Sequence, residues 1–463
     1  RGGGGGGSSG GDRRSGEDRI AEAVRNCDDG PDCASSAAAE CERTGRPWRD
    51  PNFGHDTYPG GSIGHLELRD GERGSVLNLG SEGVTWQPPS NFAATKRPLG
   101  VRGDGVPTWL YSDNDGDGVV SAAESMEADD VRQGSVGDCY FLAALSAVVQ
   151  HHPDLADDLI DETYEEHGIY GVSLWRRGRW RMTWVDSFFP CYRPSSKTHR
   201  GKHRLIFAGA TDRKEIWPLV VEKAFAKVAG SYEAISGGQV VMALEMLTGG
   251  KGRRRDPADV IAEWDRFKEE VESDEFFVGA GSQSLQRGAA SAAKQKKRLK
   301  GIVTGHAYSV LNVYEDEELR LVELRNPWGH GEWMGDWAPG SHKWNSEEGR
   351  KAISVVGRSR SNDGRFWMAW EDFVECFHSV DTCYMNFTEE DRARRAALRE
   401  EAARIIAKQD RPKPKSSGAA GVNNLHSEPT QESADAMMAL LLAEEAKEQR
   451  KKKSKKGSKK KSG

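Results

Sequence analysis

The stretch that decides the fold runs from Gln133 to Gln150 and reads QGSVGDCYFLAALSAVVQ. A loop of small residues leads to Cys139, and the apolar residues after it recur at the spacing of a buried helix stripe. Cys139 is therefore expected at a helix N-terminus, where unpaired amide groups and the helix dipole favour the thiolate, the nucleophilic form of cysteine. The alternative for a lone cysteine is a buried structural role.

Three other residues are candidate partners for a catalytic cysteine. Gln133 precedes Cys139 in the same loop, His306 lies in the segment TGHAYSV, and Asn326 lies in LRNPWG. A cysteine nucleophile needs a base, and the base needs a group that orients it; these partners can be distant in sequence and adjacent in the fold. Cysteine, histidine and asparagine in this order fit the arrangement of papain-like proteases.

The segments around His306 and Asn326 also predict how these two residues meet. Residues 307–314 and 318–325 alternate between apolar and polar side chains, which predicts two strands. His306 begins the first strand and Asn326 ends the second, so antiparallel pairing would bring them together at one end of a sheet. Upstream, residues 168–186 predict two strands about a tight turn, and residues 215–230 predict a helix with one apolar face.

Four blocks in order along the chain resemble the protease core of the calpain family. They are QGSVGDC, WPLVVEKAFAKVAGSYEAISGG (217–238), GHAYSV, and RNPWG followed by GEW. WRDPNFGHDTYPGGSIG (48–64) and VTWQPPSNF (84–92) resemble earlier landmarks of that core, so the resemblance runs from about Trp48 to about Phe387. It implies an α+β fold with two papain-like lobes: a helical lobe that carries the cysteine, and an antiparallel β lobe that carries the histidine and the asparagine.

The resemblance implies an intracellular, calcium-dependent cysteine endopeptidase that cleaves protein substrates. Cys139 would form the acyl-enzyme, His306 would act as base and then acid, and Asn326 would orient the imidazole. Gln133 would help to stabilise the oxyanion, and Trp328 would shield the contact between asparagine and histidine. Two other classes stay open: a catalytically silent, calpain-like calcium-sensing binding module, and acyl transfer as in transglutaminases, which usually use aspartate as the orienting residue.

A calcium-binding pattern interrupts the calpain-like core before Gln133. The segment DNDGDGVVSAAE places Asp113, Asp115, Asp117 and Glu124 at the positions of D-x-[DN]-x-[DN]-G-x₅-E. Alternate carboxylate oxygens can converge on a hard cation, and a final glutamate contributes two more oxygens. The alternative is a solvated turn, which residues of these types also form.

The resemblance implies two further calcium sites, one in each lobe. Asp130 and Glu222 match the acidic residues of the first-lobe site, although Glu222 could equally be a solvated acid or an ion-pair partner of a nearby lysine. Glu332 and Asp363 match residues of the second-lobe loop. Arg365 stands where the family tends to place an acid, and a cation there would repel calcium.

The pattern along the chain predicts four parts. Residues 1–47 are expected to be a disordered Gly/Ser-rich arm, 48–250 the first lobe with the inserted loop 113–124, 251–388 the second lobe, and 389–463 a charged helix, a linker and a Lys-rich tail. The tail is compatible with contacts to anionic surfaces or with a nuclear address, while the chain as a whole, with a net charge of −6, does not predict an obligate nucleic-acid partner.

The cysteine content predicts a cytoplasmic, or more generally intracellular, location. The seven cysteines are odd in number and scattered along the 463 residues, so they do not form a disulfide framework. No apolar segment of a secretory signal is apparent in the sequence. A reducing compartment is therefore expected. The oligomeric state and the substrate preference are not indicated by any pattern in the sequence.

Overall fold

The computed structural model describes residues 32–54, 62–64, 67–69, 76–78, 84–93, 100–101, 107–111, 126–192, 203–211, 215–284, 293, 295, 297–317, 319–356 and 362–385. The described residues all belong to one compact unit within residues 1–398. The predicted loop 113–124 and the predicted C-terminal part 389–463 lie outside the described residues.

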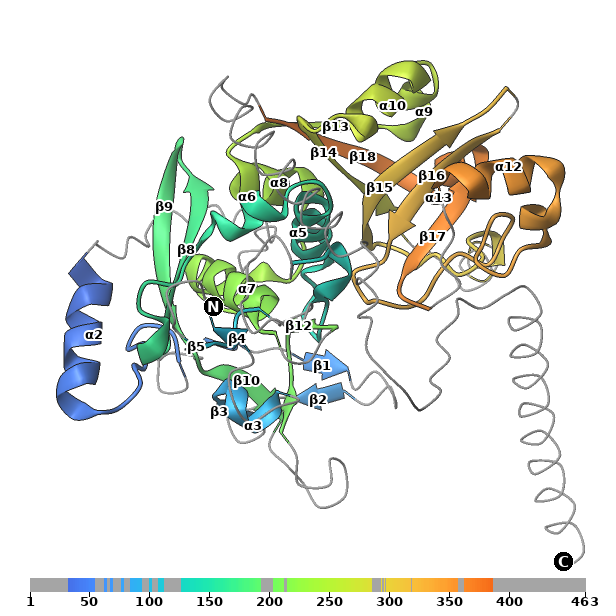
Figure 1. The fold of residues 1–463 in the computed structure, drawn as a ribbon. Helices are drawn as coiled ribbons and strands as arrows, with labels where there is room; N and C mark the ends of the chain where they lie inside the picture. Colours follow the sequence, from blue (N-terminus) through green and yellow to red (C-terminus); the bar gives the residue numbers. More distant parts are fainter. Residues whose placement is uncertain are drawn as a thin grey trace, which may run out of the picture. The chain divides into compact units, whose positions relative to one another are not determined.

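Helix α5 (Cys139–His151) is the centre of the helical lobe (Figure 1). Residues 140–149 are all buried, which is why this stretch is apolar on every face and not only along one stripe. α5 packs against α8 (Val240–Thr248) on one side and against two strands of the large sheet, β14 (Phe276–Ser282) and β15 (Ala307–Glu315), on another. The nucleophile helix therefore contacts both lobes directly.

Helix α7 (Trp217–Ala229) is the second buried helix of this lobe. Proline in its first turn removes an N–H that would have no partner there, and Gly230 ends the helix with a φ of +100°, a conformation that favours glycine. α7 packs against the hairpin of β8 (Ile169–Arg176) and β9 (Arg179–Asp186), which pair in the antiparallel register predicted for residues 168–186.

The remaining elements before α8 are short. They are β1 (Glu67–Arg69), β2 (Val76–Asn78), β3 (Val84–Gln87), α3 (Pro89–Phe92), β4 (Gly100–Val101), β5 (Pro107–Thr108), η2 (Ala128–Asp130), β6 (Val131–Arg132), α6 (Pro153–Asp157), β7 (Ile160–Asp161), η3 (Glu165–His167), β10 (Phe189–Tyr192), β11 (Arg204–Leu205), β12 (Gly209–Ala210) and η4 (Glu233–Ile235). The strands among them form small antiparallel sheets.

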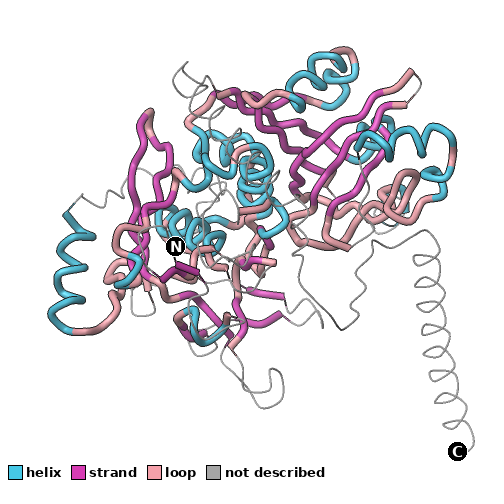
Figure 2. Tube along the Cα trace, in the orientation of Figure 1, coloured by secondary structure: helices cyan, strands magenta, loops and turns pink. Residues whose placement is uncertain are grey.

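The second lobe is built on a six-stranded antiparallel sheet in the order β13-β18-β14-β15-β16-β17 (Figure 2). Its other strands are β13 (Lys251–Arg255), β16 (Arg320–Arg325), β17 (Arg365–Ala369) and β18 (Phe377–Tyr384). The helices of this part are α9 (Pro257–Ile261), α10 (Trp264–Glu272), η5 (His342–Asn345), α12 (Glu347–Val356) and α13 (Trp370–Cys376). Aromatic side chains of α10 and α13 pack against buried strand residues to form the core of this lobe.

The structure differs from the expectation of a disordered arm over residues 1–47. Residues 32–44 form helix α2 (Asp32–Thr44), which packs Ala34 and Ala38 against Ile169 and Trp184 of the β8–β9 hairpin. Ala34, Ala38 and Cys41 are buried at the spacing i, i+4, i+7 of one helix face. Small and charged residues predict disorder because they provide little apolar surface. In α2, however, the small side chains allow a close approach to a neighbouring aromatic face.

The mixed helix and antiparallel sheet architecture confirms the predicted α+β class. Within the part of the chain described here, no helix combines the length and the apolarity required to cross a membrane.

Candidate active site

Cys139 is the first residue of α5, as the sequence predicts. The thiol of Cys139 interacts with three backbone N–H groups. Those of Cys139 and Tyr140 lie at the helix N-terminus, and that of Ala307 lies in the second lobe. Ala307 follows His306 directly and begins β15. The half-buried sulfur therefore lies at the junction of the two lobes, beside the residue next to the predicted base.

His306 and Asn326 are hydrogen bonded, with 2.9 Å between His306 Nε2 and Asn326 Oδ1. The antiparallel pairing of β15 with β16 brings them together, since Ser309 pairs with Arg325 near the end of this ladder. The amide of Asn326 has one orientation that satisfies its neighbours: Oδ1 accepts from the N–H of Trp328 (3.0 Å) and Nδ2 donates to the carbonyl of Gly331 (2.9 Å).

This orientation of the amide also fixes the protonation of the imidazole. Asn326 presents an acceptor oxygen to His306, so Nε2 must carry the hydrogen when the ring is neutral. Nδ1 is then the unprotonated nitrogen, which is the one able to take a proton from a thiol. The carboxamide thus selects the tautomer that a general base requires.

Trp328 lies over the imidazole, with 4.8 Å between the ring centroids of Trp328 and His306. The side chains of His306 and Asn326 are buried, whereas Trp328 is half-buried and so covers them from the solvent side. Excluding water from this hydrogen bond strengthens it, because the local dielectric is lower. This arrangement is the one expected for a shielding tryptophan.

Gln133 lies beside the nucleophile loop and across from the Asn326 turn. Its N–H donates to the carbonyl of Pro327 (2.8 Å), and its side-chain Nε2 donates to the carbonyl of Val136 (2.7 Å). Gln133 and Asn326 are thereby tied to each other across the two lobes. The side chain of Gln133 also interacts with the buried carboxyl of Asp138.

Burial opposes charge on both reacting groups. It raises the pKa of Cys139 to about 11, and although the N–H groups at the helix N-terminus lower this pKa, as the sequence suggests, their effect is the smaller one. Burial likewise lowers the pKa of His306 to about 4. Burial of each group therefore favours the neutral thiol and the neutral imidazole, against the effect of the helix N-terminus on the thiol.

A second pair of titratable groups lies behind the nucleophile. Asp138 and Glu222 are buried next to each other, and Glu222 accepts a hydrogen bond from the N–H of Ala208 at 3.0 Å to each carboxylate oxygen. Burial raises the pKa of Asp138 to about 7; burial and the neighbouring Asp138 raise that of Glu222 well above its usual range. Two carboxyl groups this close hold a proton between them.

The predicted first-lobe calcium ligands have different neighbours in the structure. Glu222 faces Asp138, whereas the carboxylate of Asp130 accepts from the N–H of Glu127 (2.8 Å) and has Arg325 nearby. Burial raises the pKa of Asp130 to about 7. The predicted loop ligands Asp113, Asp115, Asp117 and Glu124 lie outside the described residues.

The predicted second-lobe ligands do come close to each other. Glu332 accepts from the N–H of Gly364 (3.1 Å), Asp363 accepts from the N–H of Arg365 (2.9 Å), and the charge of Asp363 contributes to a raised pKa of Glu332, although burial is the larger cause. These two carboxylates suit a hard cation in their chemistry. Within the described ranges, however, no three or more His, Cys, Asp or Glu side chains gather as a metal site.

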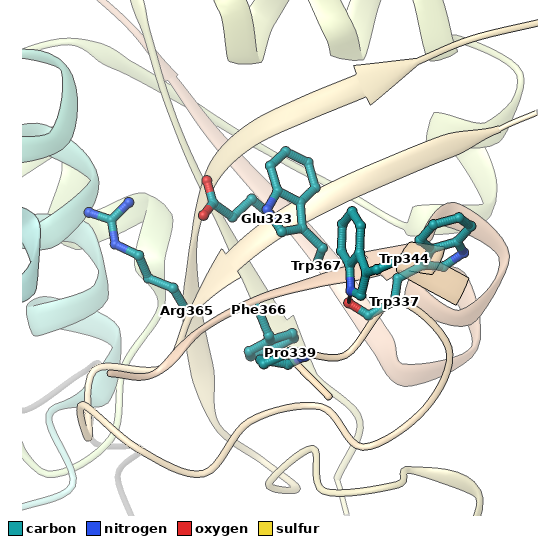
Figure 3. A pocket seen from close by; sticks show the side chains of 7 residues that line it. All are labelled: Glu323, Trp337, Pro339, Trp344, Arg365, Phe366 and Trp367. Carbon is teal, nitrogen blue, oxygen red and sulfur yellow. Dashed lines mark hydrogen bonds between the residues drawn. The ribbon is translucent and has the colours of Figure 1, made fainter. Parts of the chain in front are cut away.

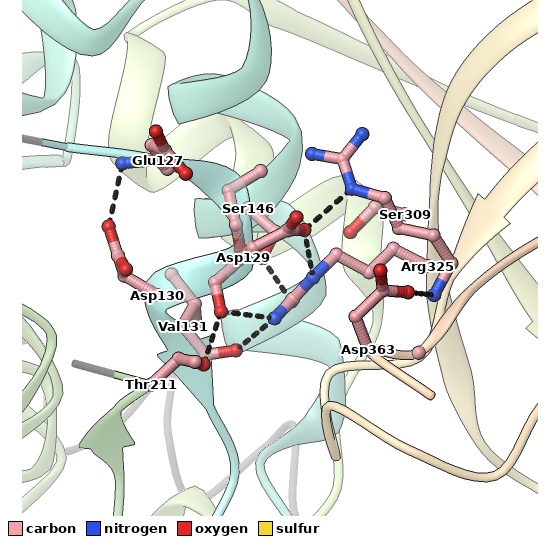
Figure 4. Close-up of polar contacts among 12 residues, drawn as sticks. Glu127, Asp129, Asp130, Val131, Ser146, Thr211, Ser309, Arg325 and Asp363 are labelled. Atoms are coloured by element: carbon pink, nitrogen blue, oxygen red, sulfur yellow. Dashed lines mark hydrogen bonds and ion pairs between the residues drawn. The ribbon is translucent and has the colours of Figure 1, made fainter. Parts of the chain in front are cut away.

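No pattern in the sequence indicates a role for Asp129 or Arg325, which join the lobes next to the site (Figure 4). The sequence alone places Arg365 as a cation inside the predicted calcium loop. Figure 3 shows the guanidinium of Arg365 directed away from Trp337 and Trp344, and it bonds Asp129 and Gln150 of the other lobe. The alternation of side chains along β16 and β17 could have indicated the direction of the two arginines, but not their partner.

Comparison with known proteins gives a consistent result. Residues 105–384 match the calpain family cysteine protease domain. A calpain-type cysteine protease ADL1 of Oryza sativa subsp. japonica is 37% identical over 271 residues, which cover 56% of this chain and 12% of that protein. Calpain-9 of Homo sapiens is 32% identical over 272 residues, covering 55% and 36%, and a calpain of Schistosoma mansoni is 29% identical over 330 residues, covering 67% and 40%. The chain thus matches less than half the length of each of these relatives.

Proposed function

The chain belongs to the calpain family of cysteine proteases, and from this membership we propose that it is a cysteine endopeptidase that cleaves internal peptide bonds of protein substrates. The observation that carries the proposal is the hydrogen bond between His306 Nε2 and Asn326 Oδ1, formed beside the segment that contacts the thiol of Cys139. A base held in one tautomer next to a thiol is the arrangement that nucleophilic hydrolysis requires.

In the proposed reaction, His306 Nδ1 takes the thiol proton as the sulfur of Cys139 attacks the carbonyl carbon of the substrate. Because both groups start neutral, this proton moves during the attack and not before it. The side chain of Gln133 and the N–H of Cys139 would donate to the oxyanion, and loss of one such donor typically costs about 10²–10³ in rate. His306 then protonates the leaving amine, and water hydrolyses the acyl-enzyme by the reverse proton transfers.

Asn326 favours hydrolysis over acyl transfer to an amine. A carboxamide accepts the Nε2–H bond without adding a negative charge, whereas an aspartate would stabilise the imidazolium. The carboxamide of Asn326 carries no charge, and its bond to His306 is buried beneath Trp328. We therefore place transglutaminase-type transfer second.

We further propose that Ca²⁺ regulates the enzyme without taking part in the chemistry. The proposal is supported by the carboxylate pattern of residues 113–124 and by the closeness of Glu332 to Asp363. When bound, the ion would neutralise converging carboxylates and order the loops that carry them. Isothermal titration with Ca²⁺ of the parent and of Asp115→Asn tests this directly; equal binding by both would remove the loop from the account.

We also propose an intracellular location in the cytoplasm. The Lys-rich tail would allow entry into the nucleus. The support for an intracellular location is that the described cysteines Cys41, Cys139, Cys191, Cys376 and Cys383 are free thiols. The proposed partners are protein substrates, without an obligate nucleic acid.

Casein digestion by the parent, by Cys139→Ala and by Cys41→Ala tests the proposed activity, with and without Ca²⁺. Cys41 is a matched control because it is a buried cysteine in α2, outside the site. Peptide release by the parent and by Cys41→Ala, but not by Cys139→Ala, is expected. No release by the parent at any Ca²⁺ concentration would favour the alternative, a catalytically silent binding module.

A further inference from the structure

Asp129 lies between two arginines of the opposite lobe. Its Oδ1 accepts from Arg325 Nε at 3.0 Å and from Arg365 Nε at 2.6 Å. Arg325 and Arg365 are cross-strand partners at the end of the β16–β17 ladder, so two positive charges lie side by side there. The Arg325 side chain has no exposed surface, and Asp129 and Arg365 are 30% and 20% exposed, so this is a largely buried charge cluster.

The two guanidinium groups also bond the elements that carry the nucleophile (Figure 4). Arg325 donates to the carbonyls of Asp129 (3.0 Å) and Val131 (2.7 Å) and to the hydroxyl of Ser146 on α5 (2.8 Å). Arg365 Nη2 donates to Gln150 Oε1 near the end of α5 (2.9 Å). Each arginine thus reaches from the sheet lobe to the helix that Cys139 begins.

The backbone next to each of these arginines is in contact with the orienting residue Asn326. Arg325 directly precedes Asn326, and the N–H of Asn326 donates to the carbonyl of Gly364, the residue before Arg365 (2.9 Å). Gly364 has a φ of +90°, and a β-carbon on it would lie 2.7 Å from the carbonyl oxygen of Asn326. The backbones of Gly364 and Asn326 are therefore closely packed. A shift of either arginine would therefore move Asn326, and with it the imidazole that Asn326 orients.

We propose that Asp129 is a positioning residue: its carboxylate, by binding Arg325 and Arg365 together, holds the His306–Asn326 corner against the Cys139 lobe. The proposal rests on the proposed peptidase function. Its physical basis is charge compensation: the carboxylate of Asp129 bonds both guanidinium groups, and Asp130 also stabilises the positive charge of the fully buried Arg325. An uncompensated buried guanidinium would withdraw toward water and separate the lobes at this point.

In this proposal, Arg365 has a different role from the one that its place in the sequence suggests. In the loop it would be a cation that repels calcium. In the structure it instead supplies a fixed positive charge that joins the lobes. The corner of the site next to Arg365 is therefore assembled by residues of the chain itself.

The test compares charge reversal with a conservative replacement at the same position. Arg365→Asp places a carboxylate beside Asp129 and is expected to lower kcat about 10²-fold with little change in KM, since misplacement of a reacting group affects the chemical step. Arg365→Lys keeps a positive charge beside Asp129 and leaves the contact between Asp129 and Arg325 in place, so it is expected to retain most of the parent kcat. Asp265→Asn, an exposed aspartate at the start of α10, is the control.

A second measurement separates this proposal from the proposed function. The N–H of Gln133 is bonded to the carbonyl of Pro327 in the other lobe, so its hydrogen exchange reports contact between the lobes whether or not the protein is active. Exchange in the peptide around Gln133 is expected to rise in Arg365→Asp and to stay near the parent level in Arg365→Lys, while exchange in the centre of α5 stays slow. Unchanged exchange and unchanged kcat in Arg365→Asp, or an Arg365→Lys variant no better than Arg365→Asp, would overturn the proposal. An inactive parent with the expected exchange pattern would instead overturn the proposed peptidase function alone.

Discussion

Replacing Asn326 by alanine removes three hydrogen bonds at once. Asn326 Oδ1 accepts from His306 Nε2 (2.9 Å) and from the N–H of Trp328 (3.0 Å), and its Nδ2 donates to the carbonyl of Gly331 (2.9 Å). At about 1 kcal/mol net for each bond, Asn326→Ala is expected to lower the free energy of unfolding by about 3 kcal/mol.

The loss of activity should exceed what this instability alone would cause. The imidazole of His306 would be left with a buried N–H that has lost its acceptor, at a cost of about 1–3 kcal/mol. Because about 1.4 kcal/mol corresponds to a tenfold rate change, kcat/KM should fall about 10- to 10²-fold, and most of this change should appear in kcat. The ring is also free to rotate and to exchange tautomers, so the larger value is expected.

Two further variants complete this experiment, which follows cleavage of a fluorogenic peptide below the unfolding temperature of each protein. Asn345→Ala removes an exposed asparagine at the end of η5 and should leave kcat/KM unchanged. Asn326→Asp keeps an acceptor for His306 but adds a negative charge, which should raise the pKa of His306 from about 4 and move the acidic limb of the pH–rate profile to higher pH. If folded Asn326→Ala keeps most of the parent kcat/KM, the orienting role of Asn326 is refuted.

Three other predictions concern the cover, the thiol and the N-terminal helix. Trp328→Ala should admit water to the bond between His306 and Asn326 and lower kcat about tenfold, measured by the same peptide assay; an unchanged kcat would contradict shielding. Because burial raises the pKa of Cys139 to about 11 and lowers that of His306 to about 4, both are neutral in between; alkylation by iodoacetamide should therefore rise about tenfold per pH unit from about pH 6 to 9, whereas a preformed ion pair would give a flat profile. Ala38→Asp should place a charge against the β8–β9 hairpin and lower the unfolding temperature, and an unchanged temperature would mean that α2 contributes nothing to stability.

The position of the nucleophile and its partners could be predicted because each depends on local pattern. The apolar run after Cys139 requires a buried helix, and the two alternating segments ending at Asn326 require a hairpin that brings this residue to His306. Helix 215–230 and the hairpin 168–186 were predictable for the same reason.

The features that sequence could not predict depend on contacts between distant segments. Asp129 is one of two adjacent acids, and only the approach of β16 and β17 to η2 selects it as the partner of Arg325 and Arg365. Burial raises the pKa of Cys139, and this burial has no local signature in the sequence. The docking of α2 was missed because its buried face consists of small side chains.

Covalent labelling tests whether Cys139 and His306 form one reacting pair. A peptidyl chloromethyl ketone, which requires an attacking sulfur in a peptide-binding cleft, would be incubated with the parent and with His306→Ala, and the modified residue identified by mass spectrometry. One adduct is expected in the parent, on Cys139, and none in His306→Ala. Labelling of Cys139 at the same rate without the imidazole, or an adduct on another cysteine, would contradict it.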